Sequence, residues 1–312
     1  MIMKTYEKIF QELLTATDFM SGEALAEQLQ LSRAAIWKAI KQLEKQGIVI
    51  DSLKNRGYRL LAGDILLPEV ITNRTGLAVY YHVTSASTQV DAKQGIEAGN
   101  PSPALYLASS QTAARGRFSR PFFAAEQGGI YMSLHLEPQV PFGQLPSYTL
   151  LIAASIVKAI QNLAGIDTSI KWVNDIYLGN KKIAGILTEA ISDVETGTVA
   201  HIIIGVGINF FISDFPKELE SKASSLFTSQ PPITRNDLIT EIWRIFFTSN
   251  HEDLFELYKK HSLVLGHEIS YQSQGQSWTA TAVDVLKTGE LVVETSTGLQ
   301  KLSSGEISLI KW

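Results

Sequence analysis

Two short segments joined by a glycine–asparagine pair constrain the fold of this chain more than any other feature. Residues 170–178 alternate apolar and polar side chains, which is typical of a half-buried strand. Gly179 and Asn180 are a strong signal for a tight hairpin turn, and residues 183–188 have the composition of a returning strand. The sequence therefore predicts a hairpin of two short buried strands.

Four polar side chains in this hairpin do not belong in a protein core: Lys171, Asn174, Asp175 and Lys182. Burying a charge or an unpaired amide costs roughly several kcal/mol unless a partner is present. These groups therefore face either water, as on the solvated side of an edge ribbon, or a bound ligand. The hairpin by itself leaves both interpretations open.

A second segment, residues 111–120, favours the ligand. It places Arg115, Arg117 and Arg120 around Gly116 with little acidic compensation. Guanidinium groups bind carboxylate and phosphate through paired hydrogen bonds. The glycine would allow the backbone to approach such a ligand closely. The segment is therefore expected to bind an oxyanion.

Together these segments resemble the biotin–protein ligase family, and within it the bifunctional bacterial ligases that also repress the biotin operon. The family has a Lys-Trp-Pro-Asn-Asp strand and a Lys-x-x-Gly-Ile-Leu-x-Glu strand. Residues 171–175 and 182–189 match them, with Val173 in place of the proline. The resemblance extends over almost the whole chain.

The arginine segment matches its family counterpart, Gly-Arg-Gly-Arg-Arg-Gly, less closely. Ala114 replaces the first glycine, Phe118 replaces an arginine and Ser119 replaces the last glycine. The substitutions make the loop less flexible and remove one charge. We therefore expect loop ordering, and with it the affinity for an adenylate or its leakage, to differ from the family pattern.

Composition narrows the class of protein. A chain of 312 residues predicts two or three domains, and 45% hydrophobic with 19% charged residues is typical of a soluble globular protein. We expect no signal peptide, and no membrane span because no apolar run reaches the roughly 18 residues that a span needs. The absence of cysteine excludes disulfides, thiolate zinc sites and cysteine nucleophiles, and it fits the cytoplasm.

Residues 1–63 have the pattern of a winged helix-turn-helix domain. Three predicted helices are followed by two strands, at 4–15, 22–29, 33–46, 48–50 and 58–61. Polar and basic side chains on the third helix and the wing could meet phosphates and base edges. The predicted DNA contacts lie within Gly22–Lys41, especially at Ser32, Arg33, Trp37 and Lys38, and in the wing at Lys54 and Arg56. A small helical interaction or dimerisation domain is the alternative.

The segment Gly22–Lys41 also resembles the family's helix-turn-helix. Residues 1–62 hold nine Lys and Arg against seven Asp and Glu, a net charge of +2, whereas the whole chain has −4. These values exclude a bulk nucleic-acid binder and predict weak DNA binding by one copy. Specific binding to operator DNA is therefore expected from a homodimer on two half-sites, promoted by the bound adenylate.

The rest of the chain is predicted to form two further domains, which makes the protein an α+β multidomain chain. After a linker over 62–68, residues 64–265 are the ligase domain, an α/β unit with a mixed sheet and helices. Besides the hairpin its predicted strands are 79–83, 104–108, 128–136 and 202–209, and its predicted helices are 90–98, 148–163, 238–247 and 253–261. Residues 266–312 are typical of a small SH3-like β-barrel, with strands at 268–271, 278–285, 291–294, 299–302 and 307–310.

Ser87, Thr88 and Gln89 follow the first of these strands, and the default interpretation of such a cluster is a helix cap. In the family the matching loop binds the ureido ring of biotin, and hydroxyls suit it because each can donate or accept. The resemblance implies that biotin also contacts Gln111, Arg115, Gly116, Arg117, Lys182, Gly185 and Gly205.

The resemblance also implies a nucleotide site and catalytic roles. ATP or the adenylate would contact Arg117, Arg120, Phe122, Asn174, Lys182 and Asn209, with the Phe122 ring stacked on adenine. Catalysis would rest on Lys182, Arg115, Arg117 and Asp175. In the family the lysine bridges carboxylate and α-phosphate, and the aspartate orients the acceptor lysine. Trp172 is expected in the core.

The implied reaction suits these residues. The carboxylate of biotin and the triphosphate of ATP must meet in a site that concentrates positive charge and excludes water. Mg²⁺ would accompany the phosphates, and no metal ion held by protein side chains is expected. In-line displacement at phosphorus needs positioning rather than a protein nucleophile. The expected protein is an ATP-dependent ligase that forms biotinyl-5′-AMP, transfers biotin to a lysine of a biotin carboxyl carrier protein, and represses biotin genes with biotinyl-AMP as corepressor.

Two other functions stay open. A lipoate or octanoate ligase would share the central fold, but its pocket should be a long apolar tunnel without the hydrogen-bonding set at residues 87–89. A non-catalytic biotin-sensing repressor would keep the DNA-binding domain and the pocket. Lys182 and the three loop arginines argue against this second alternative.

Overall fold

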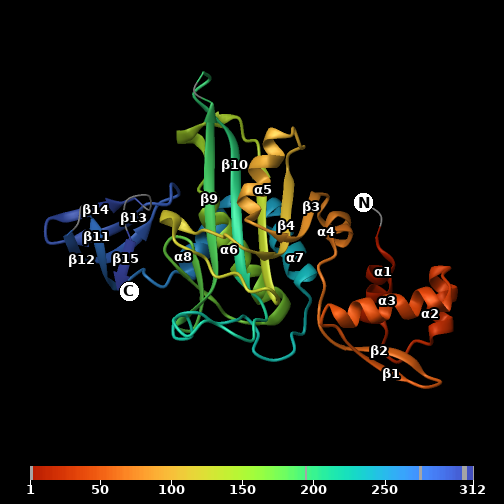
Figure 1. Cartoon of the computed structure of the whole chain (residues 1–312). Helices are drawn as coiled ribbons and strands as arrows, with labels where there is room; N and C mark the ends of the chain where they lie inside the picture. Colours follow the sequence, from red (N-terminus) through yellow and green to blue (C-terminus); the bar gives the residue numbers. More distant parts are fainter. Residues whose placement is uncertain (1–2, 194, 274–275, 304–307, 312) are drawn as a thin grey trace.

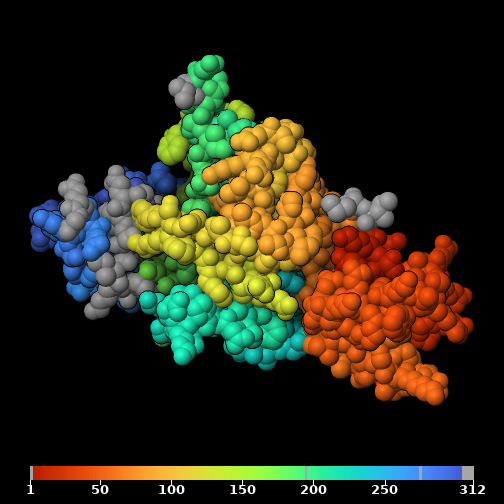
Figure 2. Space-filling view, in the orientation of Figure 1, coloured from red at the N-terminus to blue at the C-terminus, as the bar shows by residue number. Residues whose placement is uncertain are grey.

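The computed structural model describes residues 3–193, 195–273, 276–303 and 308–311. A helical N-terminal domain and a small C-terminal sheet flank a central domain on opposite sides (Figure 1). The space-filling view shows the same arrangement, with the central domain between the two smaller bodies (Figure 2).

The N-terminal domain has the predicted elements. They are α1 (Thr5–Thr15), α2 (Gly22–Leu29), α3 (Arg33–Lys45), β1 (Val49–Leu53) and β2 (Gly57–Ala62). Ser21 and Ser32 cap α2 and α3, because each hydroxyl accepts a hydrogen bond from the backbone N–H three residues further on. The third helix ends one residue earlier than predicted, and Gly47 follows in the left-handed region at φ +85°. β1 and β2 pair antiparallel as a wing.

The central domain is built on one mixed sheet, with strand order β3-β4-β5-β10-β9-β8-β7. Its strands are β3 (Ala78–Ser85), β4 (Ala104–Gln111), β5 (Gly129–Leu136), β7 (Ser169–Lys171), β8 (Asp175–Leu178), β9 (Lys181–Asp193) and β10 (Thr198–Asn209), and the short β6 (Val140–Pro141) pairs with β10. β3 and β4 run parallel, whereas the other neighbouring strands pair antiparallel. The predicted mixed sheet is confirmed.

Residues 170–178 do not form one strand, which corrects the predicted hairpin. The chain reverses over Trp172–Asn174, so that β7 pairs with β8. Trp172 and Val173 are both buried, and two consecutive buried residues break the alternation of a strand. The predicted turn at Gly179 is confirmed, since β8 and β9 pair on either side of it and its φ is +58°.

Helices cover both faces of the sheet. α6 (Tyr148–Ala164), α7 (Arg235–Thr248) and α8 (His251–Lys260) pack with one face into the main apolar core. α5 (Thr88–Glu97) lies on the other face (Figure 1), where Ala92 packs with Tyr106 and Ile203. Residues 142–164 are long and apolar enough to cross a membrane by length and composition alone. Ten side chains of α6 are buried in the protein, which is the pattern of a core helix.

The predicted linker is not a free tether. α4 (Pro68–Thr75) follows it, and Ile65, Leu66 and Leu67 are buried. Asp64 forms an ion pair with Arg235 of α7, with Oδ2 to Nε at 3.1 Å. The next residue, Asn236, donates to the Ile65 carbonyl and accepts from the Leu67 N–H, both at 2.8 Å. The chain between the N-terminal and central domains is therefore held against α7.

The C-terminal domain is a five-stranded antiparallel sheet of the expected SH3-like type. Its strands are β11 (Glu268–Ser273), β12 (Gln276–Val285), β13 (Leu291–Thr295), β14 (Gly298–Leu302) and β15 (Ser308–Lys311), in the order β14-β13-β12-β11-β15. Ile307, the predicted start of the last strand, lies outside the described residues.

Candidate ligand-binding pocket

A pocket opens where the N-terminus of α5, the loop over residues 114–122 (hereafter the arginine loop), the first half of β9 and the second half of β10 meet. Nearly all of the predicted ligand residues line it: Ser87, Thr88, Gln89, Gln111, Arg115, Gly116, Arg117, Arg120, Phe122, Asn174, Asp175, Lys182, Gly185 and Gly205. Asn209 is not among the lining residues, and its buried side chain donates to the Ser224 carbonyl at 3.1 Å. The two predicted segments are therefore brought together by the fold.

The polar cluster at residues 87–89, at the start of α5, does not supply the capping hydrogen bond of this helix. Ser87 is the N-cap residue, but its side chain makes no capping hydrogen bond. Gln111 at the end of β4 does so instead, accepting from the Thr88 N–H at 2.7 Å. The Thr88 hydroxyl accepts from Ser133 of β5 at 2.8 Å. These contacts fix the helix end, and the Ser87 hydroxyl lines the pocket.

The charged pair of Glu189 and Lys93 orients the side chain of Gln89. Its amide nitrogen donates to Glu189 at 2.8 Å, and Lys93 lies 3.1 Å from the other oxygen of that carboxylate. The amide oxygen of Gln89 is buried and lies against Gly205, where an added Cβ would come within 2.8 Å of it. Gly205 is therefore needed for this close packing, because any side chain would displace the glutamine.

The aromatic ring of Phe122 packs against Gly185 of β9 and Gly207 of β10. A Cβ at Gly207 would lie 2.5 Å from the ring, and one at Gly185 would lie 3.5 Å from it. Both glycines therefore form a flat floor of backbone beneath the ring.

The arginine loop is a small closed structure. The Gly116 N–H donates to the Arg120 carbonyl at 2.8 Å, and the Phe122 N–H donates to Ala114 at 3.0 Å. The Arg115 guanidinium donates to the Ser119 carbonyl at 3.2 Å. These bonds close the loop, and all three of its arginines line the pocket.

The two residues that depart from the family pattern at the loop tip have an unusual backbone. Phe118 and Ser119 have φ values of 56° and 55°, in the left-handed region that glycine favours. The Phe118 ring lies between two guanidinium groups, 5.1 Å from that of Arg117 and 5.6 Å from that of Arg120. The ring therefore holds both guanidinium groups by cation–π contacts, but it supplies no positive charge of its own.

Asn174 joins the loop to the sheet. Its side-chain oxygen accepts from Arg117 at 3.1 Å, and its nitrogen donates to the Ile186 carbonyl at 2.9 Å. The backbone carbonyl of Asn174 accepts from the Ile186 N–H as well, at 2.9 Å. This residue therefore forms the reversal between β7 and β8 and positions an arginine at the same time.

Lys182 and Asp175 form an ion pair on the pocket wall, with Nζ to Oδ1 at 2.7 Å. Both side chains are largely buried, being 32% and 20% exposed. Asp175 is the sole carboxylate among the described lining residues, whereas five cations line the pocket: Arg115, Arg117, Arg120, Lys171 and Lys182. The pocket is therefore strongly positive and suits a ligand with several negative charges.

The fifth of these cations, Lys171, was not assigned a ligand role from the sequence. Burial lowers its pKa to about 8, with Asp175 opposing the shift and Lys182 adding to it. Burial also lowers the pKa of Arg117. The signal for Lys171 was its charge within the apolar hairpin.

Besides Lys171, the lining residues that were not assigned a ligand role from the sequence are Ala114, Phe118, Pro121, Met132, Trp172, Ile186, Leu187, Val206 and Gly207. Trp172 was expected in the core, and it is 4% exposed with its indole N–H donating to the Gly289 carbonyl at 3.0 Å. It nevertheless lines the pocket as well. The apolar members give the pocket a face without charge beside the arginines.

In the N-terminal domain, the side chains predicted to contact DNA are exposed, both on α3 and in the wing. Trp37 on α3 is 55% exposed, and Lys38 beside it and Lys54 in the wing are exposed too. Two of the predicted cations have acidic partners: Arg33 lies 2.5 Å from Glu23, and Arg56 lies 3.0 Å from Asp18. The exposed pairs are weak in water and would exchange for phosphate readily.

Comparisons with known proteins agree with this arrangement. The Biotin/lipoate A/B protein ligase family matches residues 80–209, an HTH domain matches residues 6–59, and the Biotin protein ligase C terminal domain matches residues 264–310. The bifunctional ligase/repressor BirA of Bacillus subtilis is 34% identical over 308 residues, which are 94% of this chain and 94% of that protein. BirA of Escherichia coli is 32% identical over 202 residues, which are 63% of this chain and 61% of that protein.

A solved structure, biotin protein ligase from Aquifex aeolicus in complex with biotin and ATP, superposes with a TM-score of 0.63. It is 24% identical and covers 75% of this chain and 99% of its own, so it supports the fold. The family itself follows from the near full-length identity to the Bacillus protein, together with the three matched domains. The chain therefore belongs to the family of bifunctional biotin–protein ligases and biotin operon repressors.

Proposed function

We propose that this protein is an ATP-dependent biotin–protein ligase that also binds DNA as a repressor of biotin genes. One observation carries the enzymatic half: five cations and one carboxylate line a pocket whose other end offers hydroxyl and amide groups. Two anions, the carboxylate of biotin and the triphosphate of ATP, match the first end. The ureido ring matches the second, because hydroxyls and amides satisfy both its carbonyl and its N–H groups.

In the first step a carboxylate oxygen of biotin attacks the α-phosphorus of ATP, and the bond from that phosphorus to the bridging oxygen breaks. Pyrophosphate leaves, and biotinyl-5′-AMP stays in the pocket. The arginine loop and Lys182 stabilise the charge on the reacting oxygens. Mg²⁺ would accompany ATP and neutralise part of the charge on its phosphates. A pocket with a single carboxylate among its described lining residues fits a metal ion carried in by the nucleotide.

In the second step the neutral amine of an acceptor lysine attacks the acyl carbon, and the bond to AMP breaks. The ammonium of the incoming lysine gives up one proton to water to become this amine, and the nitrogen loses a second proton to water as the amide forms. Lys182 is paired with Asp175 in this structure, and an anionic ligand draws it toward the new charge. Asp175 is then available to receive the ammonium of the incoming lysine and to orient it. The acceptor is the biotin carboxyl carrier protein.

The test of the enzymatic half is pyrophosphate release by the purified protein with ATP and Mg²⁺, comparing biotin, lipoate and no acid. Biotin-dependent release is expected. Release with lipoate alone would make the protein a lipoate ligase instead. No release with any acid, from folded protein that binds biotin, would leave a sensor without catalysis.

The DNA-binding half rests on α3 and the wing. The exposed surface of α3 presents an aromatic and a basic side chain, Trp37 and Lys38, at the centre of a helix of the size that a major groove admits. The net charge of +2 on residues 1–62 favours a homodimer, because two copies double the number of phosphate contacts. Biotinyl-5′-AMP promotes this dimer and acts as corepressor.

Selection of bound sequences from a random duplex library, with biotin and ATP present, tests this half. We expect enrichment of a two-fold symmetric site, and sedimentation of the complex as a dimer. Lys38→Ala should weaken binding, whereas Lys8→Ala on the exposed side of α1 should not. Failure to enrich any sequence would contradict the repressor role, and an asymmetric site bound by one copy would contradict the dimer.

A further inference from the structure

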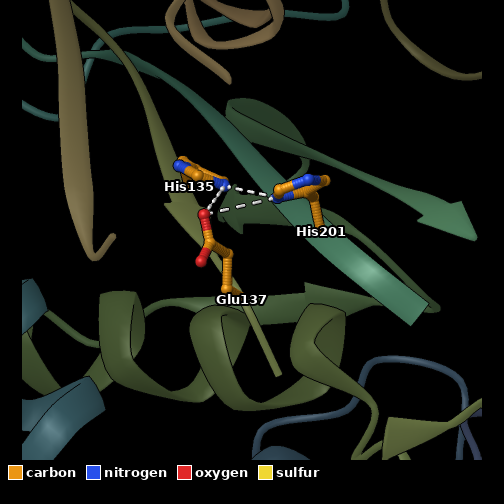
Figure 3. Close-up of side chains that lie close together, drawn as sticks. All are labelled: His135, Glu137 and His201. Atoms are coloured by element: carbon orange, nitrogen blue, oxygen red, sulfur yellow. Dashed lines mark hydrogen bonds and ion pairs between the residues drawn. The ribbon is translucent and has the colours of Figure 1, made fainter. Parts of the chain in front are cut away.

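Three side chains that commonly bind metal ions meet away from the pocket, at the far end of β5 and β10. His135 lies on β5, Glu137 follows the end of that strand, and His201 lies on β10 (Figure 3). Their approach follows from strand pairing. His135 and Leu136 are paired with Ile203 and Ile202, so the next position places Glu137 opposite His201. Alternation then brings all three side chains to the same face of the sheet.

The three atoms that face one another surround a common point (Figure 3). His135 Nε2 and His201 Nδ1 are 3.0 Å apart, and Glu137 Oε1 lies 3.6 Å from each of them. A point equidistant from the three atoms is therefore about 2.0 Å from each, which is the distance of a zinc ion from imidazole nitrogen or carboxylate oxygen. A hydrogen bond between the two rings explains the shortest side of this triangle. It does not explain why the carboxylate lies equally far from both.

We propose that His135, His201 and Glu137 bind a divalent transition-metal ion of the zinc class. Two imidazoles and one carboxylate suit Zn²⁺ or its neighbours, whereas Mg²⁺ and Ca²⁺ prefer ligands that are all oxygen. The site is separate from any Mg²⁺ that accompanies ATP. It departs from the sequence-based expectation of no metal ion held by protein side chains.

Burial divides the site into a closed and an open side. The side chain of His135 is fully buried, that of His201 is 23% exposed and that of Glu137 is 41% exposed. The ion reaches the site from the side of Glu137, and a water molecule completes a four-coordinate shell there. Carboxylate and imidazole ligands hold the two strand ends together.

The site is connected to the ligand pocket through the same sheet face. Ser133 precedes His135 by two residues and donates to Thr88 at the pocket, and Gly205 follows His201 by four residues. Four residues of strand span about 13 Å. The ion therefore stabilises two strands that also carry pocket-lining residues, Met132 on β5 and Gly205 on β10, without touching the reacting groups.

The test uses the untagged full-length protein after treatment with a chelator. Titration calorimetry with ZnCl₂ should give saturable binding of one ion per chain, and Zn²⁺ should raise Tm. Co²⁺ should give the visible absorption of a low-coordinate site. His201→Ala and Glu137→Gln should each weaken binding at least about tenfold, as loss of even an outer-shell group commonly does.

His251→Ala is the matched control, because this histidine is exposed at the start of α8 and has no part in the cluster. His135 is left unchanged, since a substitution at a fully buried position can unfold the protein. The proposal is overturned if the wild-type protein shows no saturable binding. It is also overturned if both cluster variants bind Zn²⁺ as tightly as the wild type, or if the control variant alone loses binding.

Discussion

The hairpin of β8 and β9 and the arginine loop line the same pocket, but they are held in different ways. The hairpin lies within the sheet, and β9 is paired along most of its length with β10. The loop closes on itself through a few hydrogen bonds and reaches the sheet through Arg117 and Asn174. The hairpin matches the family pattern closely, whereas the loop departs from it at three positions. The departures from the family pattern are therefore concentrated in the segment that has fewer contacts with the sheet.

Among the substitutions that test this comparison, the one at Lys182 should lower activity most, because the sheet holds this charged group in place. Lys182→Ala should lower kcat/KM for biotin-dependent pyrophosphate release by about 10²- to 10³-fold, the usual loss for one preorganised charge-stabilising group. The fold should survive, because the backbone of Lys182 keeps its hydrogen bonds to Lys222 and Ser224. Lys181→Ala is the control and should retain activity. A Lys182 variant with full transfer activity would remove its assigned role.

The connection between the two regions is tested at Asn174. Asn174→Ala removes the hydrogen bonds to Arg117 and to the Ile186 carbonyl, which should cost about 1–3 kcal/mol. Trypsin should then cleave the arginine loop of the native protein faster, because the loop opens more often. Asn180→Ala, in the exposed turn of the hairpin, should leave the cleavage rate unchanged. Equal rates in both variants would show that the loop is ordered without Asn174.

Glycine substitutions at residues 119 and 114 distinguish two effects on the arginine loop: relief of backbone strain and added backbone flexibility. Ser119→Gly relieves a left-handed residue and should stabilise the closed loop by up to about 1 kcal/mol, slowing trypsin cleavage by up to about fivefold. Ala114 has no left-handed φ, so Ala114→Gly only adds freedom and should not slow cleavage. Slower cleavage in both variants, or in neither, would contradict the role of backbone strain at the loop tip.

The smallest effect concerns Lys171. Burial lowers the pKa of this side chain to about 8. At pH 8 about half of this side chain is protonated, and an anionic ligand raises its pKa. Ligand binding at pH 8 should therefore take up as much as about half a proton, and the uptake should vanish near pH 6.5 where Lys171 is already charged. Calorimetry in two buffers of different ionisation enthalpy measures this uptake. Lys171→Met should abolish it, and an unchanged uptake would assign the proton to another group.

Much of the fold could be predicted because its signals are local. Ser21 and Ser32 cap helices where the spacing places them, and the Gly179 turn joins two strands. Most pocket residues could be named because short motifs carry them: those of the hairpin, of the arginine segment and of residues 87–89. Asn209 was predicted to contact the nucleotide. It follows Gly207, the last residue of β10 that lines the pocket, and does not line the pocket itself.

Other features depend on contacts between residues far apart in the chain. The linker residues 63–67 look free in the sequence, and only the packing of α7 shows that Asp64 meets Arg235. The acidic partners of Arg33 and Arg56 are likewise a matter of tertiary structure. His135 and His201 are separated by 66 residues, and no spacing rule connects them.

The sequence by itself determined the three-domain plan, the helices and turns, and the chemical character of the pocket, because periodicity, capping and motif residues act over short distances. Tertiary structure alone decided the reversal at Trp172–Asn174, the lowered pKa of Lys171 and the cluster at His135. Each of these depends on burial and on strand register, and both are set by the packing of the whole sheet rather than by neighbouring residues.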